Sequence, residues 1–190
     1  MNRQYAPPNF ARDHTVGQLY DEERVALYQH ILASMPQNVF EIGTWRGGGS
    51  TYFISSALAV NDYGHLWTFE INPGHYGRAV ELYTTGELKH LRRFISFNLG
   101  DSLVLIPPIA KNAQPMDFVL IDGGPDHEEA SAIQQMNELE MVRPFLVKDS
   151  VVAIHDWGLG KTSKTEPHLL DSDEFMFFSL IHTLAFFRKV

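Results

Sequence analysis

The residues best suited to chemistry stand directly after five short apolar segments of the chain. The first segment leads into a glycine-rich stretch that begins at Gly43, and the next two are followed by Glu70 and Asp101. The fourth is followed by Asp122 and the fifth by His155-Asp156. If these segments are strands of one parallel sheet, the residues meet at its carboxyl edge, where ligands bind. The spacing therefore predicts one site that combines carboxylates, an imidazole and a glycine-rich loop.

The glycine-rich stretch, Val39 to Phe53, is typical of a strand, a tight turn and the start of a helix. Glycines have no Cβ, so backbone N–H groups and the positive end of the helix dipole can approach a ligand there. A dinucleotide fingerprint would need glycine at Trp45, and a phosphate-binding P-loop would need lysine at Gly49. The sequence therefore favours a nucleotide-type ligand other than NAD, ATP or GTP.

Strand and helix patterns alternate along the chain. Helical spacing begins near Asp21, and apolar runs predict five strands, at 39–42, 66–69, 93–97, 117–121 and 151–154. Such continuous apolar runs are typical of strands that are buried on both faces of a sheet. We therefore expect an α/β fold with a Rossmann-like doubly wound sheet, mostly parallel, and helices on both faces.

The chain of 190 residues is expected to form one domain. Residues 1–14 have little periodicity and predict an extended arm, and residues 15–35 predict a leading helix. Residues 39–157 form the expected core, and residues 158–190 a loop and a C-terminal cover.

Charge and composition argue against several classes of partner. The net charge is −8, with 15 basic and 23 acidic residues, and no basic stripe suits a nucleic acid. The chain has no cysteine, which fits a reducing compartment and excludes thiolate metal ligands. Its most apolar segment, 175–187, is interrupted by polar residues. We therefore expect a cytoplasmic protein that binds no nucleic acid and does not span a membrane.

The core carries the pattern E-x-G-x-x-x-G-x-G-S/T, formed by Glu41, Gly43, Gly47, Gly49 and Ser50. From about Val39 to Trp157 the chain resembles the class I S-adenosylmethionine-dependent methyltransferases. The resemblance implies that Glu41 and the loop flank the methionine part of the cofactor, that Glu70 accepts hydrogen bonds from the ribose, and that Asp101 meets the adenine. The implied cofactor-binding residues are Glu41, Gly43, Thr44, Gly47, Gly49, Ser50, Glu70, Asp101, Ser102 and Asp122. A sulfonium cation without phosphates suits carboxylates.

The stretches Asp122-Gly123-Gly124 and His155-Asp156-Trp157 resemble a narrower branch. It contains the metal-dependent catechol-type O-methyltransferases and the related macrocin- and cephalosporin-tailoring enzymes. The resemblance implies that Asp122 and Asp156 bind Mg²⁺ and that His155 is a third ligand or a base. Such an ion would lower the pKa of a substrate hydroxyl. Ordinary strand-end polarity beside a cofactor, without a metal, stays open as the alternative.

The chain departs from this branch where the catalytic base is expected. Catechol-type enzymes have a lysine shortly after the fourth-strand aspartate, whereas here the stretch 123–127 ends in His127. The expected catalytic residues are therefore His127, His155 and Asp122, with a surface histidine as the alternative for His127. Residues 158–167, which include Lys161, are expected to form a mobile loop over the site.

The C-terminal segment is short for this family, whose sheet normally closes with an antiparallel pair of strands. Residues 171–182 predict a helix, which leaves 183–190 for at most one strand, so we expect the final hairpin to be truncated or replaced. The tail contains five phenylalanines, at 175, 177, 178, 186 and 187. These would form an exposed apolar patch unless they pack on the sheet or on another subunit, so we predict a homodimer.

The resemblance implies a methyltransferase that acts on a hydroxyl group of a small molecule, with or without Mg²⁺. Two alternatives stay open. The missing local lysine and the short C-terminus suggest an inactive cofactor-binding protein of the same fold. The same scaffold also occurs in hydroxylase-like tailoring enzymes.

Overall fold

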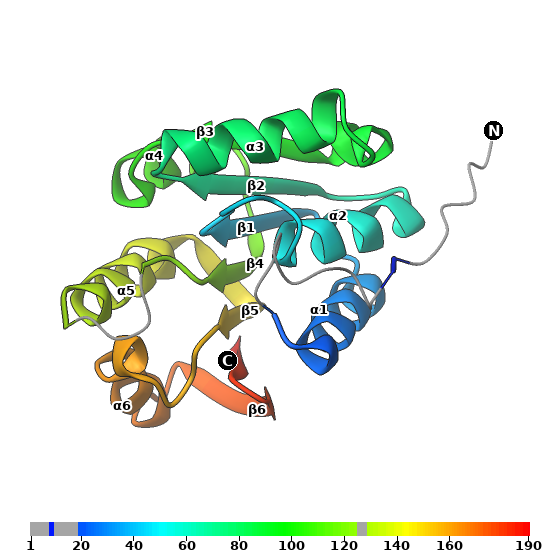
Figure 1. Cartoon of the computed structure of the whole chain (residues 1–190). Coiled ribbons are helices and arrows are strands. Elements are labelled where there is room, and N and C mark those ends of the chain that lie inside the picture. The colour runs from blue at the N-terminus through cyan, green and yellow to red at the C-terminus, as the bar shows by residue number, and fades with distance from the viewer. Residues whose placement is uncertain (1–7, 10–18, 125–128) are drawn as a thin grey trace.

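The protein, described here by a computed structural model, is built around one sheet (Figure 1). The structure describes residues 8–9, 19–124 and 129–190, and within them the sheet has seven strands. Their order across the sheet is β3 (Ile95–Leu99), β2 (His65–Glu70), β1 (Asn38–Ile42), β4 (Met116–Ile121), β5 (Leu146–Ile154), β7 (Leu184–Lys189) and β6 (Phe175–Ile181). Strands β1 to β5 pair in parallel, and β7 is antiparallel to both β5 and β6. The predicted Rossmann-like, mostly parallel sheet is confirmed.

Helices alternate with the strands along the chain. The α-helices are α1 (Asp21–Ser34), α2 (Ser50–Asn61), α3 (Pro73–Thr84), α4 (Ser102–Ala110), α5 (Glu129–Val142) and α6 (Thr165–Leu170). The described part of the chain also contains the short 3₁₀ helices η2 (Lys89–Phe94), η3 (Arg143–Phe145) and η4 (Gly160–Thr162). The leading helix predicted before the first strand is therefore present as α1. Among the described helices, none combines the length and apolarity that a membrane span needs.

The sheet is buried on both faces because helices cover each of them. All five residues of β1 are buried, and successive side chains point to opposite sides. Val39 packs in the core formed with α1 and α2, whereas Phe40 packs in the core formed with α4, α5 and α6. In Figure 1, α1 and α2 lie on one side of the strands, and α5 and α6 lie on the other. The continuous apolar runs in the sequence follow from this two-sided burial.

Two helices start directly after strands because side chains cap them. The Asn72 side chain accepts hydrogen bonds from the N–H groups of Gly74 (2.8 Å) and His75 (3.1 Å), and Pro73 opens α3. The Asp101 carboxylate accepts from the N–H of Leu103 (2.9 Å) at the start of α4. Both caps fix the chain at the carboxyl edge of the sheet.

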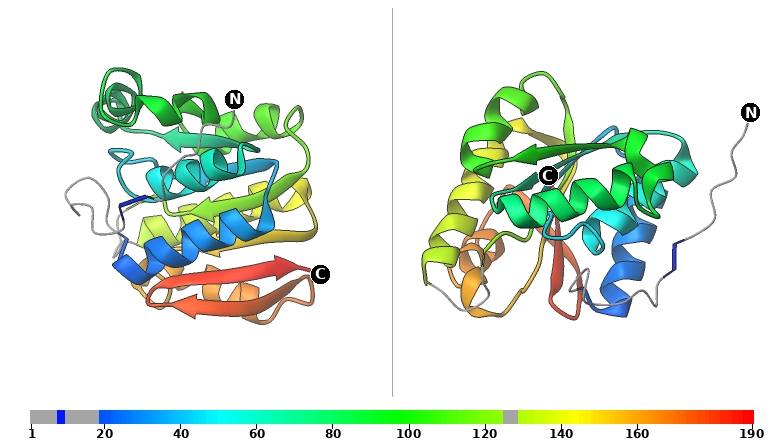
Figure 2. Two further views of the ribbon diagram at one scale, coloured as in Figure 1. Left: turned by 90° about the vertical axis from the view of Figure 1, so that its right-hand side faces the viewer. Right: turned by 45° about the horizontal axis from the view of Figure 1, so that its top comes forward.

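The predictions of a C-terminal helix and of a truncated hairpin are wrong, because residues 175–189 form a complete antiparallel hairpin (red in Figure 2). The expected helix over 171–182 is replaced by β6, and His182 (φ 50°) lies in the turn between the strands. Strand β7 lies between β5 and β6, so Leu184 to Phe187 are all buried. Periodicity alone cannot assign a short continuous apolar run such as 175–181 to a strand or to a helix.

Candidate functional site

A cavity of about 640 Å³ opens at the carboxyl ends of β1, β2 and β4. Most of the residues predicted to bind a cofactor line it, namely Gly43, Thr44, Gly49, Ser50, Glu70, Ser102 and Asp122. Its wall also contains Leu19, Ile42, Trp45, Phe69, Ile71, His75, Gly100, Gly123, Gly124, Gln134, Glu138 and Lys161. The predicted edge of the sheet is thus the edge where the cavity lies.

Gly43 allows β1 to turn into the loop against the neighbouring strand. Its φ is +98°, and a Cβ there would lie 2.6 Å from the carbonyl oxygen of Asp122. The N–H groups of Gly43 and Thr44 both donate to the carbonyl of Phe69, at 3.0 and 3.1 Å. The start of the loop is therefore tied to β2 and pressed against the end of β4.

Gly47, in contrast, faces α3 and does not line the cavity. Its carbonyl accepts a hydrogen bond from the hydroxyl of Tyr83 (2.8 Å), and a Cβ would lie 3.0 Å from the Cβ of Ala79. This glycine allows close packing of the loop on α3. Its prediction as a cofactor-binding residue stays a prediction.

Glu41 lies beneath the loop and is fully buried. Its Oε2 accepts hydrogen bonds from the hydroxyls of Thr51 (2.7 Å) and Thr68 (2.6 Å). Burial raises the pKa of Glu41 to about 7, although hydroxyl hydrogen bonds act in the opposite direction. Glu41 thus links the first turn of α2 to β2 and supports the loop from below.

Glu70 lines the cavity and holds two backbone segments at once. Its Oε2 accepts from the N–H of Trp45 (2.7 Å), and its Oε1 accepts from the N–H of Asn72 (2.8 Å). A carboxylate has about four acceptor positions, so both oxygens can accept further hydrogen bonds. Glu70 therefore combines a structural role in the loop with the capacity to bind ligand hydroxyls.

The cavity wall beside Ser102 contains an acid that the sequence reasoning missed, Glu138 on α5. Asp101 is exposed and caps α4, whereas Ser102 lines the cavity and donates to Oε1 of Glu138 (2.7 Å). Gln134 donates to the same oxygen (3.0 Å). Oε2 of Glu138 is buried and has no hydrogen-bond partner among the described residues, and burial raises the pKa of this carboxyl. The sequence could have indicated Glu138, because it is a glutamate on the face of α5 that is buried.

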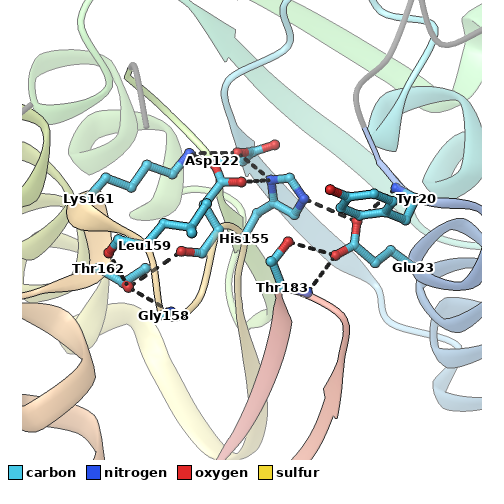
Figure 3. A network of polar contacts seen from close by, with 10 residues as sticks. Tyr20, Glu23, Asp122, His155, Gly158, Leu159, Lys161, Thr162 and Thr183 are labelled. Atoms are coloured by element: carbon cyan, nitrogen blue, oxygen red, sulfur yellow. Dashed lines mark hydrogen bonds and ion pairs between the residues drawn. The ribbon is translucent and has the colours of Figure 1, made fainter. Parts of the chain in front are cut away.

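Beside Asp122 on the cavity wall, His155 joins three carboxylates (Figure 3). Its Nδ1 lies 3.0 Å from Oδ1 of Asp122 and 3.3 Å from Oδ1 of Asp156, and its Nε2 lies 3.2 Å from Oε2 of Glu23. Burial favours the neutral ring, but the carboxylates outweigh it and raise the pKa of His155 to about 12. The ring is therefore a buried imidazolium that donates from both nitrogens.

Glu23, on α1, was not predicted to belong to the site. Its side chain is fully buried, and Oε1 accepts from the N–H (2.9 Å) and the hydroxyl (2.8 Å) of Thr183 in the β6–β7 turn. Its Oε2 accepts from the N–H of Tyr20 (2.9 Å). Glu23 therefore ties the leading helix and the C-terminal hairpin to His155.

Lys161, in η4, is the other residue that the sequence reasoning did not assign to the site. Its side chain is 1% exposed, and Nζ lies 2.9 Å from Oδ1 of Asp122 (Figure 3). The same Nζ lies 2.5 Å from Oδ2 of Asp156. Burial favours the neutral amine, but the two carboxylates outweigh it and raise the pKa of Lys161. Burial raises the pKa values of Asp122 and Asp156, but the positive charges of His155 and Lys161 outweigh it and hold both values below their usual range.

The segment around Lys161 is packed, contrary to the expectation of a mobile loop. The hydroxyl of Thr162 is buried, donates to the carbonyl of Leu159 (3.0 Å) and accepts from the N–H of Gly158 (3.1 Å). The hydroxyl of Thr165 donates to the side chain of Gln135 on α5 (2.6 Å). The predicted base, His127, lies outside the described residues.

The sheet order and the cavity at the carboxyl edge define a Rossmann-like cofactor-binding protein. A family model described as "Methyltransferase domain" matches residues 40–157, which is more than half of the chain. The protein therefore belongs to this methyltransferase family. The resemblance to class I S-adenosylmethionine-dependent methyltransferases that the sequence indicated is confirmed. A search of curated proteins finds no match.

Solved structures with this fold include several O-methyltransferases. A proposed caffeoyl-CoA O-methyltransferase from Staphylococcus aureus has a TM-score of 0.74 at 18% identity, over 93% of this chain and 87% of that one. TomG from Streptomyces achromogenes, in complex with SAM, has a TM-score of 0.69 at 14% identity, over 90% and 81%. An O-methyltransferase from Bacillus cereus, in complex with SAH, has a TM-score of 0.66 at 16% identity, over 97% and 84%. At these identities the likeness establishes the fold.

Proposed function

We propose that the protein transfers a methyl group from S-adenosylmethionine to a hydroxyl group of a small molecule. The observation that carries the proposal is the cavity, which joins the glycine-rich loop and Glu70 to the charged group around Asp122. The similar structures of TomG and of the Bacillus cereus enzyme contain SAM and SAH, which supports this cofactor. Their names as O-methyltransferases support a hydroxyl acceptor.

The donor groups on the cavity wall suit the parts of this cofactor. The loop from Gly43 to Ser50 would hold the methionine part, and Glu70 would accept from the ribose hydroxyls, as predicted from the sequence. Ser102 and Glu138 are polar residues further along the wall, and they would meet the adenine, whose exocyclic amine needs an acceptor. Glu41 would act indirectly, because it supports the loop from below.

When bound, S-adenosylmethionine supplies an activated methyl group, so the protein must position the acceptor oxygen and stabilise its developing negative charge. Lys161 lines the cavity, and its ammonium contacts Asp122 and provides such a positive charge. The imidazolium of His155 lies behind it and fixes the orientation of both aspartates. His127 stays a prediction for the base that accepts the hydroxyl proton.

Magnesium assistance through Asp122, His155 and Asp156 also stays a prediction. These three side chains each offer one ligand atom, and the atoms lie within 4.8 Å of one another. However, the ammonium of Lys161 already contacts two of the three side chains. The predictions of a cytoplasmic location and of no nucleic-acid partner likewise stay predictions.

Calorimetry with S-adenosylmethionine and S-adenosylhomocysteine tests the cofactor, and methyl transfer from labelled cofactor to a panel of catechols and sugar hydroxyls tests the activity. Glu70→Gln is expected to weaken cofactor binding, whereas Glu81→Gln, on the exposed side of α3, is the matched control. Absence of binding at hundreds of micromolar would reject the proposal. Binding without transfer to any acceptor would favour the inactive cofactor-binding protein, and oxidised products would favour the hydroxylase-like enzyme.

A further inference from the structure

The acidic pair Asp122 and Asp156 already has a cation between its two side chains. Nζ of Lys161 lies 2.9 Å from Oδ1 of Asp122 and 2.5 Å from Oδ2 of Asp156. A Mg²⁺ ion bound by the same two oxygens would lie about 2.1 Å from each of them. The ion and the ammonium would therefore compete for one position.

Lys161 cannot easily leave this position. Its side chain is 1% exposed, and its backbone belongs to η4, which packs on α5. The neighbouring Thr162 is held by hydrogen bonds to Leu159 and Gly158. A divalent ion at the aspartates would thus face a buried positive charge at close range, and that repulsion opposes metal binding.

His155 does not offer a free ligand atom either. A metal-bound imidazole presents the lone pair of one nitrogen to the ion. Here Nδ1 lies within 3.3 Å of both aspartate carboxylates, and Nε2 lies 3.2 Å from the carboxylate of Glu23. The ring is satisfied as a donor at both nitrogens, so the three predicted ligands do not fit Mg²⁺ in this arrangement.

We propose that this enzyme works without a divalent metal, and that the ammonium of Lys161 takes the position and the electrostatic role of the ion between Asp122 and Asp156. The inference rests on the proposed function. Because Lys161 and Asp122 both line the cavity, a substrate oxygen that enters it can approach the ammonium. A lysine that follows β5 thereby supplies the positive charge that the catechol-type branch obtains from Mg²⁺.

Charge and atoms balance in the transfer that this arrangement supports. The substrate oxygen forms a bond to the methyl carbon, and the bond from that carbon to sulfur breaks, with its electron pair left on sulfur. The hydroxyl proton passes to the base, for which His127 is predicted. Lys161 keeps its proton and donates a hydrogen bond to the substrate oxygen as negative charge develops on it.

Metal binding by the full-length protein tests the inference without any substrate or cofactor. Wild type, Lys161→Met and Lys164→Met are dialysed against EDTA and titrated with MgCl₂ and MnCl₂ by calorimetry at pH 7.5. Lys164 is an exposed lysine three residues away and serves as the matched control. We expect no binding at millimolar metal for wild type and Lys164→Met, and at least tenfold tighter binding for Lys161→Met. Lys161→Gln guards against a folding defect, with circular dichroism as the check.

In the metal titrations, the inference would be overturned by submillimolar metal binding of the wild type, or by no gain of binding in both folded Lys161 variants. In the activity assay, wild-type transfer is expected to be unchanged by EDTA, and Lys161→Met is expected to lose about 100-fold or more in kcat with a smaller change in KM. Loss of wild-type activity in EDTA that is restored by Mg²⁺ would also overturn it. If no acceptor is found, the proposed function fails separately, since the metal titrations can still be interpreted.

Discussion

Gly43→Ala is expected to damage both stability and cofactor binding, because this glycine lies where three strands meet the cavity. Its φ of +98° is strained for any residue with a Cβ. The new Cβ would also lie 2.6 Å from the carbonyl oxygen of Asp122 and 2.9 Å from its carbonyl carbon. Both of these atoms belong to the backbone, so no side-chain rotation can relieve the overlap.

The cost can be worked out from these two effects. A positive φ costs an alanine roughly 1–2 kcal/mol, and forcing extra atoms into a packed site costs about 1–3 kcal/mol. The sum, about 2–5 kcal/mol, is a large part of the total stability of about 5–15 kcal/mol that is typical of folded domains. Relief requires β1 to move away from β4, which displaces Thr44 and Asp122 on the cavity wall. We therefore expect at least tenfold weaker binding of S-adenosylmethionine as well.

Urea unfolding and calorimetry measure the two effects, and Gly77→Ala is the matched control. Gly77 lies on the exposed side of α3, its φ is not positive, and a Cβ there would meet nothing within 4 Å. Alanine at this helical position should raise stability by up to about 1 kcal/mol and leave cofactor affinity unchanged. If Gly43→Ala matched wild type in both measurements, the close approach of β1 to Asp122 would be refuted.

Three further predictions concern Glu138, His155 and strand β6. Glu138→Gln should weaken S-adenosylmethionine binding in calorimetry, because the unpartnered Oε2 is replaced by an amide that can donate; unchanged affinity would show that this oxygen does not meet the cofactor. The pKa of His155 is raised to about 12 from about 6.5 in the unfolded chain, so its stabilisation is complete below about pH 6.5 and is lost as the pH rises toward 12. Urea unfolding between pH 7.5 and 9 should show stability falling by up to about 1.4 kcal/mol per pH unit, and a flat profile, or the same slope in His155→Gln, would contradict this. Strand β6 leaves Met176, Phe177, Phe178 and Leu180 exposed at 37–46%, so we predict a homodimer with twice the mass of one chain in light scattering, which a monomeric mass at micromolar concentration would exclude.

The fold and one half of the site follow from local features of the sequence. The apolar runs predict the parallel strands, and a polar residue after each run must lie at the same edge of the sheet. This places Asp122 beside His155 and Asp156, although they are more than thirty residues apart. The caps at Asn72 and Asp101 are equally local, since each needs only the residues that follow it.

The other half of the site depends on contacts that leave no local pattern. Glu23 is separated from His155 by 132 positions, and in the sequence it reads as an ordinary acid in the first turn of a helix. Lys161 is separated from Asp122 by 39 positions and stands among glycine and polar residues that suggest an open loop. Only the packing of α1 against the sheet, and of η4 against α5, brings these charges together.

The buried charges also explain why these distant segments are held so firmly. An isolated buried glutamate or lysine would be strongly destabilising, so Glu23 and Lys161 must remain in contact with His155 and the aspartates. Through Glu23, the β6–β7 turn is fixed by two hydrogen bonds from Thr183, and α1 is fixed at Tyr20. Removing one charge therefore leaves its partners uncompensated on several elements at once. The same contacts that orient Asp122 toward the cavity also attach the leading helix, η4 and the C-terminal hairpin to the sheet, so the geometry of the site and the assembly of the fold depend on one network.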